Sequence, residues 1–311
     1  MFKSTFKLLL NNFSMVWKIL LYKIVVLICV VGLTSVVCLP IIKELISQGF
    51  FVFLQDNLST TFLNFNLNSL VGTLVEITNK LFLIVKDASL LPLLISASCI
   101  SIVLYYFVDR LSYLAVVDDV HSFMSSNLKL GFMNCFVANF GKSAKLGLIK
   151  LVTTFILNVG IIASACGIYY ALSTSVLALA PLVTIAYAII MFSLKITLFA
   201  GVEASMVVNN CGIIEALKRN FKAIQKKWLS IFSNTLIMVI LLFFLNMFAV
   251  FFTFGITLLI TVPITILTTI IFKNVVYYEC TGMRYYCDSN TIIMPKKLEE
   301  QDNIKRVKDI I

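Results

Sequence analysis

The chain has 311 residues, of which 60% are hydrophobic and only 13% are charged, and its mean hydropathy is +1.00. A soluble core of this size cannot bury so many apolar side chains, so the composition excludes an ordinary water-soluble domain. The net charge is +10. Its basic residues are scattered without aromatic platforms or a known binding motif, which argues against nucleic acid as a partner.

Six apolar stretches are each long enough to cross a bilayer as a helix. A helix rises about 1.5 Å per residue, so about 20 residues cover a hydrocarbon core of about 30 Å. The last two spans come from one uncharged run, which must fold back between Asn246 and Gly255. The sequence therefore predicts an all-α, polytopic transmembrane helical bundle. The predicted spans are Ile19–Leu39, Leu90–Val108, Leu151–Leu172, Val176–Ala200, Leu229–Phe248 and Phe254–Phe272.

Most of the 25 Lys and Arg residues fall on alternate connections between these spans. They lie before the first span, between Arg110 and Lys150, between Lys218 and Lys227, and from Lys273 onward. Lys and Arg are retained on the cytoplasmic side during insertion. We therefore expect a multi-pass protein of the plasma membrane with both termini in the cytoplasm, where anionic headgroups are its lipid partners.

The predicted membrane domain covers residues 1–276, and a cytoplasmic tail follows over residues 277–311. The sizeable connection on the outer side covers residues 41–89 and is too apolar for a solvated loop. Apolar residues recur at helical spacing from Leu67 to Val85. We expect one or two helices that lie in the outer interface or cap the bundle, with a break around Gln55–Ser59.

A basic amphipathic pattern precedes each odd-numbered span, and it is clearest between Ile213 and Trp228. Similar patterns begin near Phe2 and Leu128. The recurrence suggests three repeated elbow-plus-hairpin units, although any inward-facing helix entry collects basic and aromatic residues at the headgroups. Each pattern carries one Asn-Phe pair: Asn12-Phe13, Asn139-Phe140 and Asn220-Phe221. The candidate headgroup-binding residues are Lys218, Arg219, Lys222 and Lys226.

The stretch from Gly212 to Phe221, GIIEALKRNF, and the following turn Lys226-Lys227-Trp228-Leu229 carry a family resemblance. The chain resembles the six-helix membrane domain found beside some bacterial glycerophosphodiester phosphodiesterases and in related stand-alone bacterial membrane proteins. This resemblance implies a similar helical fold and a bacterial plasma membrane. It transfers no catalytic residue, because the metal-binding acids and histidines of the phosphodiesterase domain have no counterpart in this sequence.

Polar residues within the spans are the candidates for a polar path across the membrane. Charge inside lipid is costly and marks transport sites. Lys195 lies near the cytoplasmic end of its span, so its stem can also carry the ammonium out to the headgroups. Threonines in the last span line a path or, more often, bond to the preceding turn and let helices pack. The candidates are Asn158, Asn234, Thr257, Thr261, Thr265 and Lys195.

Catalytic, metal and cofactor patterns do not stand out in the sequence. The eight cysteines show no C-x-x-C spacing, His121 is the single histidine, and no glycine-rich phosphate loop occurs. We therefore expect a protein that is not an enzyme and uses no cofactor. The sequence favours a transporter or permease-like protein for a small or lipidic solute. The alternative is a non-catalytic membrane scaffold or a subunit of a membrane complex, with another membrane protein as its partner.

Overall fold

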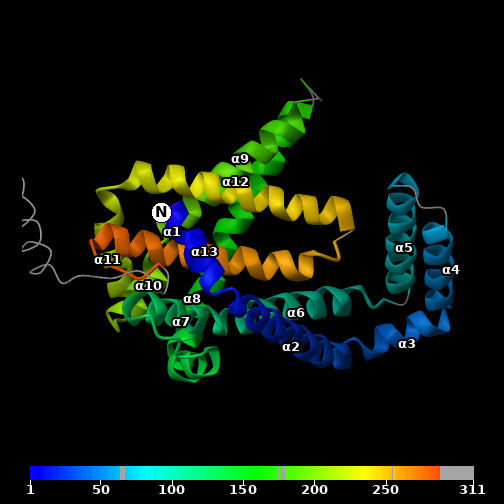
Figure 1. The fold of residues 1–311 in the computed structure, drawn as a ribbon. Coiled ribbons are helices and arrows are strands. Elements are labelled where there is room, and N and C mark those ends of the chain that lie inside the picture. The colour runs from blue at the N-terminus through cyan, green and yellow to red at the C-terminus, as the bar shows by residue number, and fades with distance from the viewer. Residues whose placement is uncertain (64–66, 88, 174–175, 177–178, 254, 288–311) are drawn as a thin grey trace, which may run out of the picture. The chain divides into compact units, whose positions relative to one another are not determined.

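A computed structural model describes residues 1–63, 67–87, 89–173, 176, 179–253 and 255–287 (Figure 1). Within these residues the regular elements are all α-helices, and six helical segments are long and apolar enough to cross a membrane. Large apolar side chains on these helices are widely exposed, as a surface in contact with lipid requires. The chain is a multi-pass integral membrane protein, and the predicted all-α six-span fold is confirmed.

Each predicted span overlaps one long helix. The fold-back in the last apolar run lies at the C-terminal end of the predicted stretch from Asn246 to Gly255, because one helix ends at Thr253 and the next begins at Leu258. Between them, Gly255 has a φ of +85°, a conformation that glycine adopts without steric cost. The six helices are α2 (Ser14–Val37), α6 (Leu91–Leu111), α8 (Phe132–Ser173), α9 (Ala180–Leu198), α12 (Trp228–Thr253) and α13 (Leu258–Thr281).

Two of the three predicted amphipathic segments are helices separate from the span that follows, namely α1 (Phe2–Asn11) and α11 (Ile213–Gln225). The segment that begins near Leu128 is continuous with its span, because α8 runs for 42 residues without a break, which is about 63 Å of helix. Asn139 does not interrupt it, since its Nδ2 donates both to Cys135 O of the preceding turn and to Asp118 Oδ2 of α7 (Tyr113–Ser126). The threefold repeat stays a prediction.

The described helices form two compact units. The first unit contains Met1–Tyr22 and the chain from Arg110 onward. Its helices pack in a closed circuit, in which α8 contacts α9, α9 contacts α12, α12 contacts α13, α13 contacts α7, and α7 contacts α8. The second half of α13 is the centre of this unit, with Leu267, Ile271 and Val275 fully buried. The short helix α10 (Val202–Val208) packs against α7, α11 and α13.

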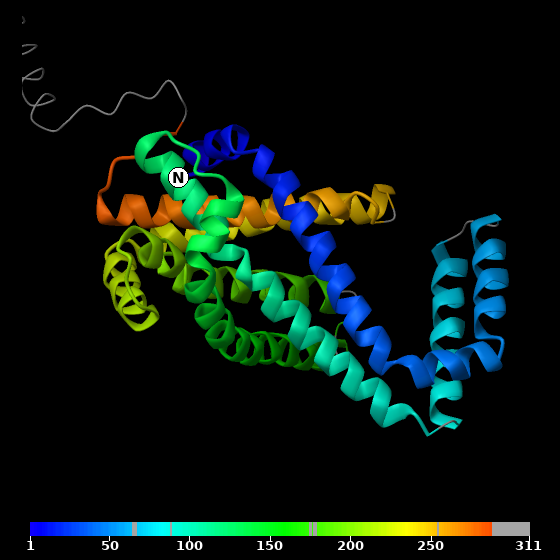
Figure 2. The same ribbon diagram turned by 90° about the horizontal axis from the view of Figure 1, so that it is seen from below.

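One end of the first unit gathers segments that are far apart in sequence (Figures 1 and 2). The amino group of Met1 lies 3.1 Å from Glu279 Oε1, and Lys227 Nζ donates to Glu279 O at 3.1 Å. Asn11 Nδ2 also donates to Cys287 O at 3.0 Å. The first residues, the basic α11 region and the end of α13 therefore lie at the same end of the unit.

α13 extends beyond the predicted start of the tail at residue 277. Tyr277 and Tyr278 are 4% and 3% exposed, so they belong to the core of the unit and not to a tail. The Tyr277 hydroxyl accepts a hydrogen bond from Asn209 Nδ2 at 2.7 Å, and the Tyr278 hydroxyl lies 2.5 Å from Nδ1 of His121. These contacts with α7 and the end of α10 stabilise the added turns of helix. Residues 288–311 of the predicted tail lie outside the described residues.

The second unit contains residues Lys23–Asp109. Its helices include most of α2 and α6, which are joined by Lys23 Nζ and Asp109 Oδ1 at 2.5 Å. Between them in sequence lie α3 (Leu39–Ser47), α4 (Phe50–Leu63) and α5 (Leu67–Asp87). These three helices share a small apolar core of Ile41, Leu45, Phe50 and Val85.

The helix predicted from the spacing between Leu67 and Val85 is present as α5, whereas the predicted break around Gln55–Ser59 is wrong. Those residues lie inside α4. Asn57 Nδ2 donates to Phe53 O at 2.9 Å, and Ser59 Oγ donates to Asp56 O at 2.9 Å. Polar side chains that bond to the preceding turn are compatible with a continuous helix.

Candidate functional site: a cationic pocket

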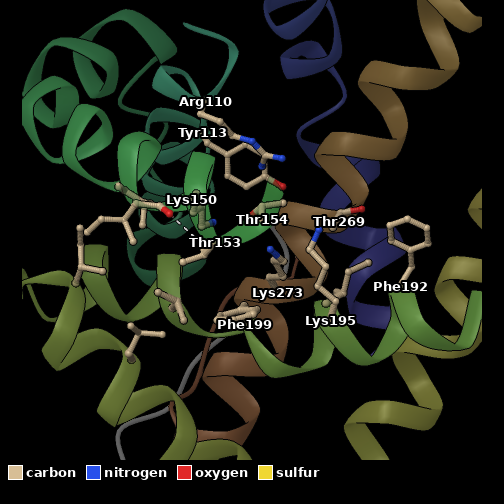
Figure 3. Close-up of a pocket in the computed structure, with 16 residues that line it drawn as sticks. Arg110, Tyr113, Lys150, Thr153, Thr154, Phe192, Lys195, Phe199, Thr269 and Lys273 are labelled. Carbon is tan, nitrogen blue, oxygen red and sulfur yellow. Dashed lines mark hydrogen bonds between the residues drawn. The ribbon is translucent and has the colours of Figure 1, made fainter. Parts of the chain in front are cut away.

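A cavity of about 280 Å³ lies inside the first unit, where α8, α9 and α13 meet. Figure 3 shows basic side chains from different helices reaching toward this space. Among the described lining residues, the cations are Arg110 at the end of α6, Lys150 on α8, Lys195 on α9 and Lys273 on α13. Hydroxyl groups of Thr153, Thr154 and Thr269 and a set of apolar side chains complete the lining. We call this cavity the cationic pocket.

One buried carboxylate partly balances these charges. Glu203 in α10 is 1% exposed, and its Oε1 contacts Lys150 Nζ and lies 3.2 Å from Lys273 Nζ. A carboxylate out of water is tolerated when it is paired with cations in this way. Among the described residues, Glu203 is one acid beside the three lysines Lys150, Lys195 and Lys273, so these groups carry an excess of positive charge.

The ring of Tyr113 in α7 lies among three of the cations. The distances to its centroid are 5.1 Å for Arg110 Cζ, 5.4 Å for Lys150 Nζ and 5.8 Å for Lys273 Nζ. An aromatic face carries negative charge density that attracts cations at this range. Tyr113 therefore helps to hold like charges around one cavity without neutralising them.

The structure brings together two residues predicted for the polar path. Lys195 Nζ donates to Asn158 Oδ1 at 2.5 Å, across the contact between α9 and α8. The ammonium group thus reaches toward the neighbouring helix and the cationic pocket (Figure 3), and not outward along its own helix. Glu203, which follows Lys195 in sequence by two helical turns, pairs with Lys150 and Lys273 instead.

The other path candidates make local or interhelical bonds away from this pocket. Thr261 Oγ1 donates to Asn246 Oδ1 at 3.0 Å, and Asn246 Nδ2 donates to Thr265 Oγ1 at 2.9 Å. Thr257 Oγ1 lies 2.7 Å from Thr253 Oγ1, and Asn234 Nδ2 donates to Ser230 O of its own helix at 2.7 Å. These bonds connect α12 to α13 or satisfy the preceding turn, so they serve helix packing. In the part of the chain that the structure describes, Asn234 and these threonines make no hydrogen bond to Asn158 or Lys195.

The candidate headgroup-binding residues are all exposed: Lys218, Arg219 and Lys222 on α11, and Lys226 at its C-terminal cap. Arg219 Nη2 pairs with Glu215 Oε1 at 2.6 Å one turn earlier. An open hollow of about 710 Å³ between α8 and α11 includes Lys145 and Lys218. It shares Ile149 and Ile213 with the cationic pocket, so the hollow adjoins the pocket.

Three pocket cations were not predicted as site residues. Arg110, Lys150 and Lys273 stand at the ends of apolar spans, where the sequence assigns them to connections and explains them by orientation alone. The sequence does predict that all three residues lie on the same side of the membrane. That prediction places them at one depth, but it does not say that their helices meet.

The arrangement can bind an oxyanion. Arginine and lysine donate strong charge-assisted hydrogen bonds to phosphate and carboxylate oxygens. The apolar lining would exclude water from such a complex and strengthen each bond. No protein-family model, curated protein or solved structure matches the chain, so these contacts carry the functional inference.

Proposed function

We propose that the protein is a transporter, permease-like in type, for a small or lipidic solute that carries an anionic group. The observation that supports this is the excess of positive charge around a cavity in the membrane-spanning unit. Ionisable groups within spans are costly and typically mark substrate or ion pathways. An anion in the pocket would offset the mutual repulsion of Lys195, Arg110 and Lys273, which gives the cavity a binding preference.

The proposed location is a bacterial plasma membrane, with the pocket opening toward the cytoplasmic side. Lys195 lies one turn before the end of α9, and the pocket that it lines also includes Val202 of α10 and Ile213 of α11. The basic residues at this end of the unit favour retention in the cytoplasm during insertion. The likeness of the α11 region to bacterial six-helix membrane domains agrees with this location.

A scaffold or complex subunit is the second candidate, and the exposed basic face of α11 favours it. That face carries Lys218, Lys222 and Lys226 without burying them against the rest of the unit. An acidic partner protein could bind there without using the cationic pocket. Copurification of a partner that is lost when these three lysines are changed to glutamine would support this function, and a monomer in mild detergent would count against it.

Reconstitution into liposomes tests the transport proposal. Flux of inorganic phosphate, glycerol 3-phosphate and fluorescent phosphatidylglycerol is compared between protein-containing and empty vesicles. We expect saturable, protein-dependent flux of at least one of these anions. Lys195→Gln should reduce the flux about tenfold or more, because a hydrogen bond to a charged group contributes about 1.5–3 kcal/mol and 1.4 kcal/mol is tenfold.

The matched control is Lys43→Gln, which makes the same change at an exposed lysine of the second unit. This variant should transport like the unchanged protein. Absence of flux for all three probes would contradict the proposal. So would equal flux in the Lys195→Gln variant, because the cationic pocket would then play no part in the activity.

A further inference from the structure

An apolar groove continues from the cationic pocket along the seam between α8 and α9. Its volume is about 530 Å³, and it shares Phe192 with the pocket. Figure 3 shows Phe192 next to Lys195 at the edge of the pocket. The other lining residues are Ile161, Ile162, Ala165, Cys166, Tyr169 and Tyr170 of α8 and Thr184 and Ala188 of α9. We call this feature the α8–α9 groove.

Small side chains keep the groove open. Ala165 on α8 and Ala188 on α9 line it, where larger residues would fill the seam between the two helices. On another side of the same helix pair, Tyr187 donates a hydrogen bond to Ser164 Oγ at 3.0 Å, which holds the helices together. The groove is therefore a feature of two packed helices and not a place where they separate.

The length of the groove along α9 is comparable with the thickness of one leaflet of a bilayer. From Thr184 to Phe192 the helix rises about 12 Å, and half of a hydrocarbon core is about 15 Å. Lys195 follows Phe192 by one turn and lies close to the end of the helix. Along α9 the order is thus the cationic pocket near the end of the helix and then the apolar groove over its middle.

We infer that the cationic pocket and the α8–α9 groove together bind one anionic phospholipid, with its phosphate among Lys195, Arg110 and Lys273 and one acyl chain in the groove. The inference rests on the proposed function, because it names the solute class of the same pocket. A lipid in its normal orientation presents its phosphate and its chain in this order. A soluble phosphate would account for the cations but not for the adjoining groove.

Charge and shape have separate roles in this site. An acyl chain gains little by moving from other lipid chains into an apolar groove, because the lipid around it is equally apolar. Selection for the ligand therefore comes from the phosphate, for which arginine and lysine are suited donors. The groove decides whether a chain attached to that phosphate can be accommodated.

The experiment uses the full-length protein, stripped of lipid in a nonionic detergent, and measures its melting temperature and its bound lipid by native mass spectrometry. Three probes are compared: phosphatidylglycerol, phosphatidylcholine with the same acyl chains, and glycerol 3-phosphate. We expect phosphatidylglycerol alone to raise the melting temperature saturably and to remain bound at one molecule per chain. The zwitterionic lipid lacks net negative charge, and glycerol 3-phosphate lacks the chains that hold a lipid phosphate in the micelle beside the pocket.

Two variants test the groove. Ala165→Phe should weaken phosphatidylglycerol binding about tenfold, because the ring would occupy the space of the chain, and Ala188→Phe should do the same from the other helix. The matched control is Ala163→Phe, two residues away on an exposed part of α8 outside the groove. It should bind like the unchanged protein. Size-exclusion profiles establish that each variant is folded, and agreement between the two groove variants separates lost space from misfolding.

The outcomes distinguish this inference from the transport proposal. If glycerol 3-phosphate protects as well as phosphatidylglycerol and the groove variants bind normally, the pocket takes a soluble anion and the inference is overturned, while transport can stand. If none of the probes binds, the inference is also overturned. If phosphatidylglycerol binds as expected but liposomes show no flux, the lipid site stands and the transport proposal fails.

Discussion

Asn220 shows how one buried side-chain amide stabilises the junction of two helices. Its side chain is fully buried, its Nδ2 donates to Leu198 O at 2.8 Å, and its Oδ1 accepts from Gly201 N at 2.7 Å. These are backbone groups that the end of α9 and the start of α10 leave without helical partners. A Cβ on Gly201 would lie 2.7 Å from Asn220 Oδ1 and 2.8 Å from Tyr277 Cδ2, so this close approach requires glycine.

Asn220→Ala should therefore destabilise the protein by about 1–3 kcal/mol, because it leaves a buried donor and a buried acceptor unsatisfied. Chemical unfolding in detergent measures the change. The control is Asn234→Ala, since Asn234 is partly exposed and bonds to Ser230 of its own helix. A shift within about 0.5 kcal/mol is expected there. Equal shifts in the two variants would show that the helix junction does not depend on Asn220.

The buried carboxylate of Glu203 should also be important for stability. Glu203→Gln should lower the free energy of unfolding by about 3–5 kcal/mol, because Lys150 and Lys273 would remain buried without their shared carboxylate. Adding Lys150→Gln to that variant should restore part of the loss by removing one of the two cations. The same unfolding measurement checks both. Unchanged stability of Glu203→Gln would contradict the view that this carboxylate holds the pocket together.

The Asn-Phe pairs show what the sequence could and could not predict about single residues. Asn12, Asn139 and Asn220 are all buried, whereas the phenylalanines that follow them are between 41% and 48% exposed. The recurrence of the Asn-Phe pair before the odd-numbered spans singles out these three positions in the sequence. Their partners could not be predicted, because Asn139 bonds to Asp118 and Asn220 bonds to Leu198, and each partner belongs to a different helix that only tertiary packing brings close.

At the element scale, the pairing of α12 with α13 separates helix packing from a polar path. Asn246 bonds to both Thr261 and Thr265 across the two helices. Asn246→Ala should cost about 0.6–2 kcal/mol, the range found for hydrogen bonds between membrane helices. Because the bonds lie outside the cationic pocket, anion flux should stay unchanged. Loss of flux with full stability would instead favour the threonine stripe as a path.

The spans were predictable because lipid constrains both the length and the composition of a crossing helix. Helix breaks were less predictable, because the same polar residues that favour turns can bond to the preceding turn of a helix. That is why α4 continues through Gln55–Ser59 and α8 continues past Asn139. The extension of α13 through Tyr277 and Tyr278 depends on burial against other helices, which hydropathy does not report.

At the scale of the whole molecule, the cationic pocket depends on helices that are distant in sequence. Arg110, Lys150, Lys195 and Lys273 each stand near one end of an apolar segment, and the sequence alone explains each of them by membrane orientation. Their convergence follows from the closed circuit of helices in the first unit. The sequence therefore predicts the side of the membrane on which these cations lie, but it does not predict that they meet in one pocket.

Membrane orientation gives the last prediction. One span, α2, separates Lys3 from Lys43, and the spans of α6, α8 and α9 separate Lys43 from Lys222. Lys3 and Lys222 should therefore lie on one side of the membrane and Lys43 on the other. Each position is changed to cysteine in a background without the eight native cysteines. An impermeant maleimide should label Lys43→Cys in intact cells, and Lys3→Cys and Lys222→Cys only after permeabilisation.

The packing of the first unit requires that Lys3 and Lys222 lie on the same side of the membrane. Met1 and Lys227 both contact Glu279, so the start of the chain and the end of the α11 region meet at one residue of α13. A bilayer cannot separate segments that share such a contact, because the hydrocarbon core is about 30 Å thick. If Lys3→Cys and Lys222→Cys were labelled from opposite faces, neither this packing nor a cationic pocket on the cytoplasmic side could exist in the membrane.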